Sequence, residues 1–187
     1  MKIRYLVLAI IGAMVLSLGA VACGDDDDDN GGNGNGGGGE LTLAEYFSDL
    51  EPLSQGYASD LDTLDEEAGE KFEGTGSDDE QIEVFVDFVK DTRSTTDDFV
   101  SDLDGLNAPA EVEDAHSEAV IAGQELVDMY DNAITVLDLS ETFEDATLVL
   151  EGPGFVDSQE RFAAACVALQ GIADSNGLDI DMSCPGG

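Results

Sequence analysis

The chain has 187 residues and carries 43 acidic side chains against only six lysines and arginines, which gives a formal net charge of −37 at pH 7. Such a charge repels the phosphate backbone of nucleic acids, so nucleic acid is excluded as a partner. Hydrophobic residues make up 42% of the chain, which is too much for a wholly disordered protein and enough for the core of one domain.

The first 22 residues have the three-part plan of an export signal. Lys2 and Arg4 form a basic start, an uncharged apolar run follows over residues 6–18, and small residues close the segment ahead of Cys23. The sequence therefore predicts that the protein is exported and that residues 1–22 are a signal peptide. Without them, four cations face 43 acids and the net charge becomes −39.

The junction Ala20-Val21-Ala22-Cys23 resembles the lipobox of bacterial lipoprotein precursors. In that family the cysteine is acylated and becomes the mature N-terminus. The resemblance implies that Cys23 carries a lipid and anchors the protein to the extracellular or periplasmic side of the cell membrane. Ala20 departs from the family, which usually has leucine at that position. Ala20-Val21-Ala22 also fits ordinary signal cleavage, and residues 6–22 are marginal for an uncleaved anchor of roughly 20 apolar residues, so both alternatives stay open.

Residues 23–41 form the predicted linker between the lipid and the folded domain. The run DDDDDNGGNGNGGGG over residues 25–39 contains no apolar side chain, so no burial can repay the entropy of ordering it. The 19 residues from Gly24 to Thr42, as a Gly-rich coil, have a root-mean-square span of roughly 25 Å. The aspartates are interpreted as a solvated spacer. The alternative is a cation-binding tract, but disordered carboxylates bind ions weakly.

The first predicted helix is defined by apolar residues that recur at steps of three or four over residues 43–72. This spacing is typical of a helix with one buried face. Thr42 and Glu45 form a capping-box pattern for its start, and Gly74-Thr75-Gly76 is expected to end it. Pro52 lies inside this segment, so we expect the helix to kink there or to break and restart.

The second and third predicted helices follow the same rule. Ser77 and Glu80 form another capping box, and apolar residues with two central threonines then alternate steps of three and four over residues 82–106. Pro109 suits the first position of the third helix, whose stripe runs over residues 112–136.

The C-terminal part of the chain is punctuated by strong stop signals. The third stripe either continues over residues 143–150 or gives way to a short separate helix after Asp138, and the sequence leaves both open. Gly152-Pro153-Gly154 is expected to end the preceding helix, and a last helix follows from Phe155 to about Asn176. Short connections between helices predict an all-α fold for residues 42–187, an antiparallel up-and-down bundle of four or five helices.

Cys166 and Cys184 are the two cysteines that remain after Cys23. The last helix climbs roughly 15 Å from Cys166 to Asn176, and an extended return from Gly177 to Cys184 reaches at most roughly 24 Å. The tail can therefore fold back along its own helix, and export favours oxidation. The sequence predicts a disulfide between Cys166 and Cys184 rather than two free thiols.

Few residues suggest catalysis. His116 is the only histidine, and beside Ala115 and Ala119 it is interpreted as a partly exposed helix residue rather than a catalyst. The sequence contains no HExxH, GxSxG, CxxC, phosphate-loop or dinucleotide-binding motif. Carboxylates are so frequent that closeness alone nominates no acid and base. The sequence therefore assigns no catalytic residue and no cofactor.

Two acidic turns, around Gly177 and Gly105, have the residue types of a calcium site. Their oxygen-bearing residues are Asp174, Asn176, Asp179 and Asp181 in one turn and Asp102, Asp104 and Asn107 in the other. Neither turn has the spacing of an EF-hand loop or its terminal bidentate glutamate. Because helix ends also require Asn, Asp and Gly, turn chemistry is the preferred interpretation and no metal ligand is assigned.

Residues 106–126, LNAPAEVEDAHSEAVIAGQEL, resemble a segment of helical-bundle lipoproteins, with an Ala-Pro helix start, a histidine and then a stripe of small and apolar residues. The resemblance covers this segment alone and implies no known activity.

These features predict a lipid-anchored, acidic helical bundle that acts at the cell surface as a binding or interaction module. The expected partner is a basic protein, a cationic solute or a wall component, and the sequence assigns no oligomeric state. One alternative is a hydrolase that uses two buried carboxylates in a groove between helices, with their pKa values pushed apart. The others are a calcium-binding surface protein, and an acidity that is an adaptation to salt and says nothing of partners.

Overall fold

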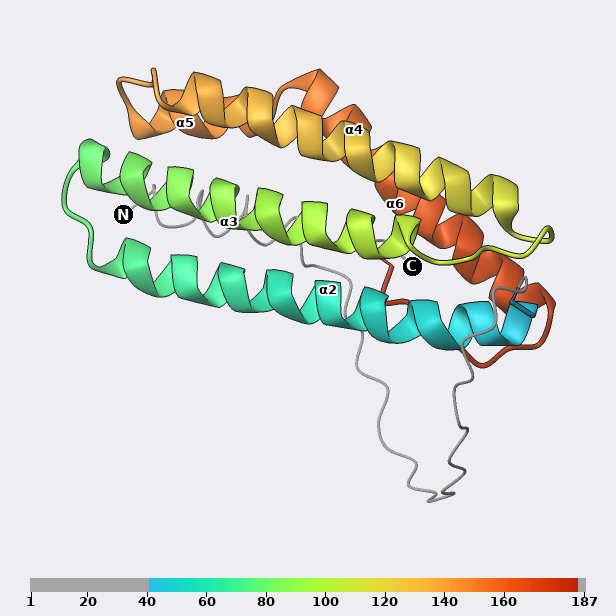
Figure 1. The fold of residues 1–187 in the computed structure, drawn as a ribbon. Helices are drawn as coiled ribbons and strands as arrows, with labels where there is room; N and C mark the ends of the chain where they lie inside the picture. The colour runs from blue at the N-terminus through green and yellow to red at the C-terminus, as the bar shows by residue number, and fades with distance from the viewer. Residues whose placement is uncertain (1–40, 185–187) are drawn as a thin grey trace.

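The computed structural model of the chain describes residues 41–184. The predicted signal peptide, Cys23 and the linker up to residue 40 lie outside the described residues. Within them, the chain is all-α, as predicted, and no β-strand occurs (Figure 1). The helices are α2 (Leu43–Glu73), α3 (Asp78–Asp104), α4 (Glu113–Leu137), α5 (Phe143–Leu150) and α6 (Pro153–Ser175). None of these helices combines the length and the apolarity that crossing a bilayer requires.

Side chains fix the starts of α2 and α3 as predicted. The Thr42 hydroxyl accepts a hydrogen bond from the Glu45 amide at 3.3 Å, and the Glu45 carboxylate accepts one from the Thr42 amide at 2.9 Å. Ser77 and Glu80 form the same reciprocal pair at the start of α3. The Thr42 hydroxyl lowers the pKa of Glu45, and the backbone amides of Gly76 and Ser77 lower that of Glu80. Both capping boxes therefore favour charged glutamates at the positive ends of their helices.

α2 runs through Pro52 as one helix, so the chain does not break there. The proline ring deprives the Ser48 carbonyl of its amide partner, but both residues lie on the exposed side of α2, where water can bind that carbonyl. On the opposite side, Ser54 donates a hydrogen bond to the C-terminal tail. Packing on one side and solvation on the other thus keep the helix continuous.

α4 begins later than the sequence predicts, and the assignment of Pro109 to its first position is wrong. The helix begins at Glu113, and Pro109 instead opens a tight turn in which its carbonyl accepts a hydrogen bond from the Val112 amide at 2.9 Å. The turn places the side chain of Val112, which is only 1% exposed, in the core cluster that also contains Leu103 and Met182. Burial of one valine thus outweighs the helix-start preference of proline.

Residues 138–150, which the sequence left open, form a turn and a separate short helix. α4 ends at Leu137, and α5 begins at Phe143 after the Thr142 hydroxyl accepts a hydrogen bond from the Asp145 amide at 3.1 Å. α5 turns its apolar face to the core and buries Phe143, Ala146, Thr147 and Leu150. The described bundle therefore has five helices, one of them short.

The long helices α2, α3, α4 and α6 alternate in direction, and both α5 and α6 lie against α4 (Figure 1). α2 packs on α3, α3 packs on α4, and α4 packs on both α5 and α6. The backbones of α2 and α6 hardly meet. Residues 178–184, here called the tail, lie between these two helices and bond to both of them. The tail therefore closes the bundle.

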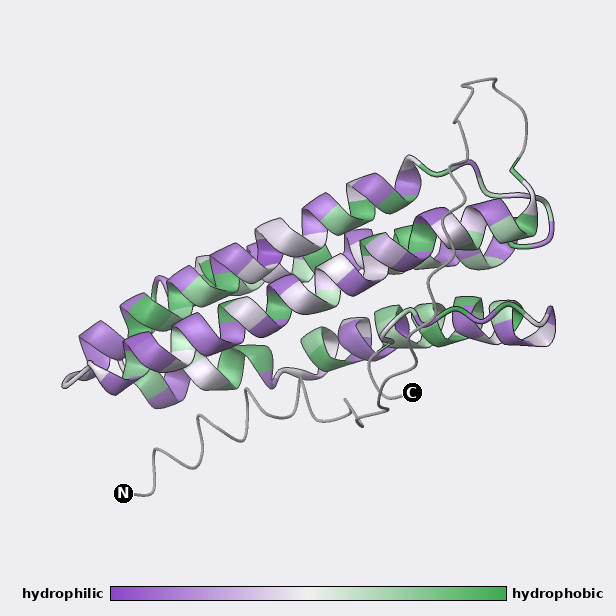
Figure 2. Cartoon of the chain, turned by 90° about the horizontal axis from the view of Figure 1, so that it is seen from below, coloured by the Kyte–Doolittle hydropathy of each residue, from purple (hydrophilic) through white to green (hydrophobic). Residues whose placement is uncertain are grey.

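The core divides into two clusters, one at each end of α2. The first contains Tyr46, Phe47, Leu103 and Met182, and the second contains Phe85, Leu137 and Phe143. Between them, Tyr57 stacks on Phe99 with ring centroids 4.7 Å apart. Figure 2 shows hydrophobic and hydrophilic residues alternating around each helix, as expected when one face is buried.

Candidate functional site

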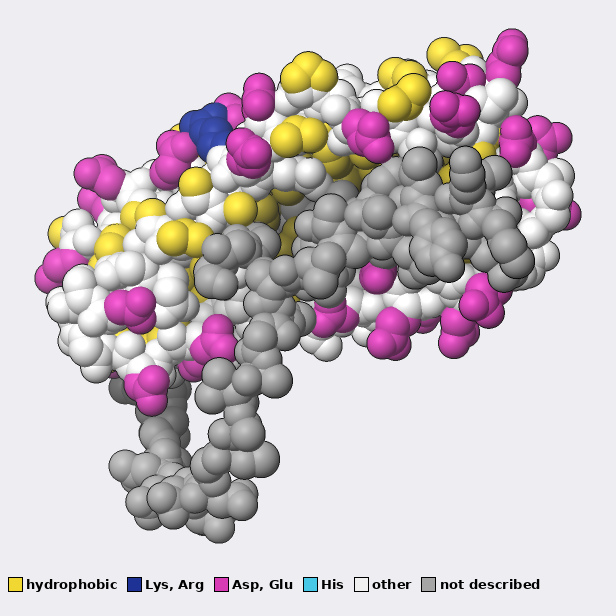
Figure 3. Space-filling model, turned by 180° about the vertical axis from the view of Figure 1, so that it is seen from behind, with side chains coloured by type: hydrophobic (Ala, Val, Ile, Leu, Met, Phe, Trp, Pro, Cys, Tyr) yellow, Lys and Arg dark blue, Asp and Glu magenta, His cyan; other side chains and the backbone are white. Residues whose placement is uncertain are grey.

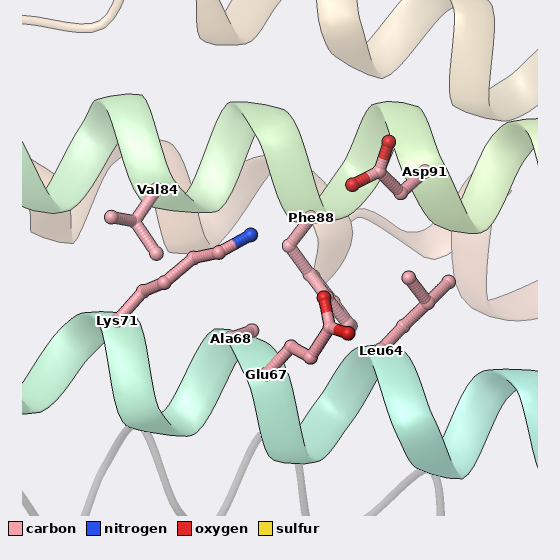
Figure 4. Close-up of a pocket in the computed structure, with 7 residues that line it drawn as sticks. All are labelled: Leu64, Glu67, Ala68, Lys71, Val84, Phe88 and Asp91. Carbon is pink, nitrogen blue, oxygen red and sulfur yellow. The ribbon is translucent and has the colours of Figure 1, made fainter.

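A small depression lies between α2 and α3 (Figure 4). Lys71 extends from α2 toward α3, between Val84 and Phe88. The remaining lining residues are Leu64, Glu67, Ala68 and Asp91. The cavity has a volume of about 10 Å³, which holds one water molecule at most. It is therefore no site for an organic ligand.

The described residues offer no pair of buried carboxylates. Ser54, Thr92, Thr96, His116 and Thr147 are the buried polar side chains among residues 41–184, and no Asp or Glu joins them. Asp65 is partly buried, and burial raises its pKa, with smaller effects from Asp62 and Glu66 on the same helix. These carboxylates lie on the surface of one helix and none is buried, so the hydrolase hypothesis finds no pair of buried acids in this part of the chain.

The acidic turns around Gly177 and Gly105 serve as helix ends. Asn176 ends α6 and donates a side-chain hydrogen bond to the Ile172 carbonyl at 2.9 Å. Gly177 follows with a φ of +71°, a conformation that favours glycine. Asp181 accepts the Ser183 amide at 2.9 Å and so shapes the tail. Within residues 41–184, no three His, Cys, Asp or Glu side chains gather closely enough to hold a metal ion.

His116 is buried, whereas the sequence predicted a partly exposed residue. Its ring is edge-on to that of Tyr46, and the Tyr46 hydroxyl shares a hydrogen bond of 3.0 Å with Nδ1. Burial lowers the pKa of His116, and the charge of Asp104 opposes this shift. The prediction failed because α4 packs against α3, α5 and α6 and so buries a wider arc than one stripe.

Polar groups inside the core are matched to one another. The Tyr57 hydroxyl lies 3.2 Å from Thr96 Oγ1, and the Thr92 and Thr96 hydroxyls donate to backbone carbonyls one turn back. Burial raises the pKa of Tyr130, while a hydrogen bond with Gln159 acts in the opposite direction. No buried side-chain nitrogen or oxygen in the described part lacks a partner. The interior therefore contains no unsatisfied group that would point to an internal ligand.

Two of the four cations in the described part hold helices together. The Arg93 guanidinium of α3 pairs with Asp97 and, at 3.0 Å, with Asp131 of α4. The Arg161 guanidinium of α6 pairs with Glu118 and Glu125 of α4, and it lowers the pKa of Glu118. Only Lys71 and Lys90 remain as further cations here. The outer surface is consequently acidic, and Figure 3 shows carboxylates spread over the visible face.

The structure joins Cys166 and Cys184, the two cysteines that the sequence paired, with their Cα atoms 5.7 Å apart. Sequence reasoning missed the polar residues that hold the tail. These are Glu51, Ser54 and Gln55 on α2 and Gln170 on α6. A usable signal was present, because residues 162–173 contain no charged side chain in a chain that is 26% charged. Such a helix is expected to be covered on more than one side.

Comparisons of the chain with protein-family models, with curated proteins and with solved structures found no significant match.

Proposed function

We propose that the protein is an exported lipoprotein that presents an acidic helical bundle at the cell surface and binds a cationic partner there. The observation that carries this proposal is the charge imbalance. Four cations stand against 43 acids after the predicted signal, and two of the four are engaged in ion pairs between helices. The partner class is a basic protein or a cationic solute.

Electrostatics supports a role in capture rather than in chemistry. A surface of one sign raises the local concentration of oppositely charged partners and speeds their association. This attraction acts over roughly 10 Å at 0.1 M salt and is screened at higher salt. We therefore expect partner binding to be fast and strongly dependent on ionic strength.

The predicted linker would place this surface well outside the membrane. The chain enters the bundle at Thr42, so that end lies nearest the lipid. The 31 residues of α2 extend the bundle by roughly 46 Å, and the linker adds roughly 25 Å. The aspartates of the linker are repelled by anionic headgroups, which favours an extended arrangement.

Intact mass measurement of the protein extracted from membranes tests the anchor. We expect a chain that begins at Cys23, carries a diacylglyceryl group and lacks the two hydrogens of the Cys166 and Cys184 thiols. In the matched control Cys23→Ser, the lipid mass should disappear and the protein should leave the membrane fraction. An untrimmed chain in the cytosol, or a trimmed chain without lipid, contradicts the proposed anchoring.

An adaptation to salt is the competing explanation of the acidity, and one observation favours it. The carboxylates are spread over the visible face rather than gathered in one patch (Figure 3). Titration of a labelled lysine-glycine repeat peptide, with a glutamate-glycine repeat as the control, separates the two. Saturable binding of the lysine peptide at 0.15 M salt supports capture of cations, and its absence at that salt leaves adaptation as the explanation.

A further inference from the structure

The tail lies between α2 and α6 in the manner of a bound peptide. Its exposure alternates along the chain: Leu178 and Ile180 are half-buried, Asp179 and Asp181 are exposed, and Met182 is only 1% exposed. Alternation of this kind is what an extended segment shows when one edge faces a protein surface.

α6 binds the tail backbone through a single side chain. Gln170 Nε2 donates to the Ile180 carbonyl at 2.7 Å, and Gln170 Oε1 accepts from the Met182 amide at 3.0 Å. An amide side chain has one acceptor and one donor group, so it matches the two backbone groups of an extended chain that flank one residue. These bonds do not depend on the side chains of the tail.

α2 binds the backbone groups that α6 leaves free. Glu51 Oε1 accepts from the Asp181 amide at 2.9 Å, and Gln55 Nε2 donates to the Asp181 carbonyl at 3.0 Å. Ser54 donates a hydrogen bond to the Met182 carbonyl. Together the two helices engage every backbone polar group from the Ile180 carbonyl to the Met182 carbonyl.

One side chain of the tail fills a socket in the core. Met182 belongs to the same buried cluster as Leu50 of α2 and Leu169 of α6. Backbone bonds combined with a socket for one side chain are the two parts of peptide recognition in a groove, the first giving affinity and the second giving specificity.

We propose that the groove between α2 and α6 is a binding site for extended peptides, which the tail occupies as an internal ligand held by the disulfide. The matching peptide has methionine or another long apolar residue for the socket and apolar residues two and four positions before it. Its intervening positions are exposed to solvent on an acidic protein, so lysine or arginine there is favoured over the aspartates of the tail. This site stands independently of the proposed lipid anchor.

Release of the tail requires reduction of the disulfide. An external dithiol supplies two electrons and two protons, Cys166 and Cys184 become thiols, and the dithiol becomes a disulfide. Until then the tail competes with any peptide as a tethered ligand at high effective concentration. The oxidised protein is therefore closed to peptides, whereas in the reduced protein a peptide competes with a tail that is tethered at one end only.

Fluorescence anisotropy with a labelled peptide tests the site in the chain after residue 23. The probe has the sequence of residues 178–183 with lysine in place of Asp179 and Asp181. The open protein carries Cys184→Ser and Met182→Asp, so that the tail cannot return to its socket. The control probe has asparagine in place of the methionine, so that both probes carry the same charge, and circular dichroism establishes that each protein is folded.

We expect saturable binding to the open protein, at least tenfold weaker binding of the control probe, and no binding to the oxidised wild type. Gln170→Met should weaken binding at least tenfold in the open protein, while Gln124→Met on the exposed side of α4 should leave it unchanged. No saturable binding to the folded open protein overturns the proposal. Equal binding of both probes also overturns it, because attraction would then be electrostatic alone.

NMR of the methionine methyl groups tests the same site in the wild-type protein if the open protein does not fold. After residue 23 the chain contains only two methionines, Met129 and Met182. In reduced wild type, the probe should move the Met182 methyl resonance toward its value in a free peptide and leave that of Met129 in place. A Met182 resonance that stays fixed at saturating probe contradicts the proposal.

Discussion

Cys166 of α6 and Cys184 at the end of the tail are bonded across a sequence separation of 18 residues, with 5.7 Å between their Cα atoms. This bond fixes the one segment that fills the space between α2 and α6, whose backbones hardly meet. The first and last helices of the bundle are thus joined mainly through the tail, beside a direct ring contact between Tyr57 of α2 and Phe162 of α6.

Removal of the disulfide should lower the free energy of unfolding by about 3 kcal/mol, as expected for a closed loop of this length. The double variant Cys166→Ala and Cys184→Ala and the reduced wild type should agree in urea unfolding. Loss of less than about 0.5 kcal/mol would mean that the tail is held by its hydrogen bonds and by Met182 alone.

Gly123→Ala should destabilise the bundle by about 1 to 3 kcal/mol through overpacking. A Cβ atom at Gly123 would overlap the stiff side chain of Val100 and approach Phe162 Cε2 to 3.1 Å, where α4 crosses α3 and α6. Gly171→Ala is the matched control. It lies on an exposed part of α6 with open space around it, so it should stabilise by about 0.5 to 1 kcal/mol. Equal effects of the two changes would refute the close helix crossing.

His116 should make stability depend on pH. Its pKa in the folded state lies below the unfolded value of about 6.5, so the unfolded state binds the proton more readily. The stability that the neutral ring contributes is therefore complete above about pH 6.5 and is lost as the pH falls through the folded pKa. Tyr46 and Asp104 are the titratable groups that act on this ring.

The measurement for His116 is a comparison of urea unfolding between wild type and His116→Gln at pH 7.5 and pH 5.5. The variant shares the carboxylates of the wild type, so subtraction removes their contribution. We expect the advantage of the wild type at pH 7.5 to shrink at pH 5.5. An advantage that is constant or larger at pH 5.5 would show that burial does not disfavour the charged ring.

Salt should raise the melting temperature of the domain. The carboxylates of the described part outnumber its four cations many times, and most of them are exposed, so their mutual repulsion is screened by added ions. Thermal melts between 0.05 and 1 M sodium chloride should show an increase of several degrees. A melting temperature that does not change with salt would remove both self-repulsion and salt adaptation from consideration.

The sequence specified the local features of this fold well. Thr42 with Glu45 and Ser77 with Glu80 mark their helix starts because a capping box satisfies amides within three residues of itself. The apolar steps likewise predicted which faces of α2 and α3 are turned inward. Capping boxes and apolar spacing can be recognised in a sequence because the residues that form them lie within a few positions of one another.

Features that depend on distant partners were harder to predict. His116 is buried by helices distant in sequence, and its ring bonds to Tyr46, which lies 70 residues earlier. Gln55 and Gln170 hold the tail, yet a glutamine that binds a backbone and one that faces water have the same pattern in a sequence. The pair of cysteines predicted the return of the tail, since chain lengths limit where two sulfurs can meet, and the uncharged run of residues 162–173 was a second signal.

Hydrogen exchange before and after reduction of the disulfide tests most directly whether the tail joins α2 to α6. We expect the amides of residues 46–57 in α2 to lose protection by at least tenfold, while those of residues 119–133 in α4 change little. A loss spread evenly over both helices, or no loss in either, would contradict the role assigned to the tail.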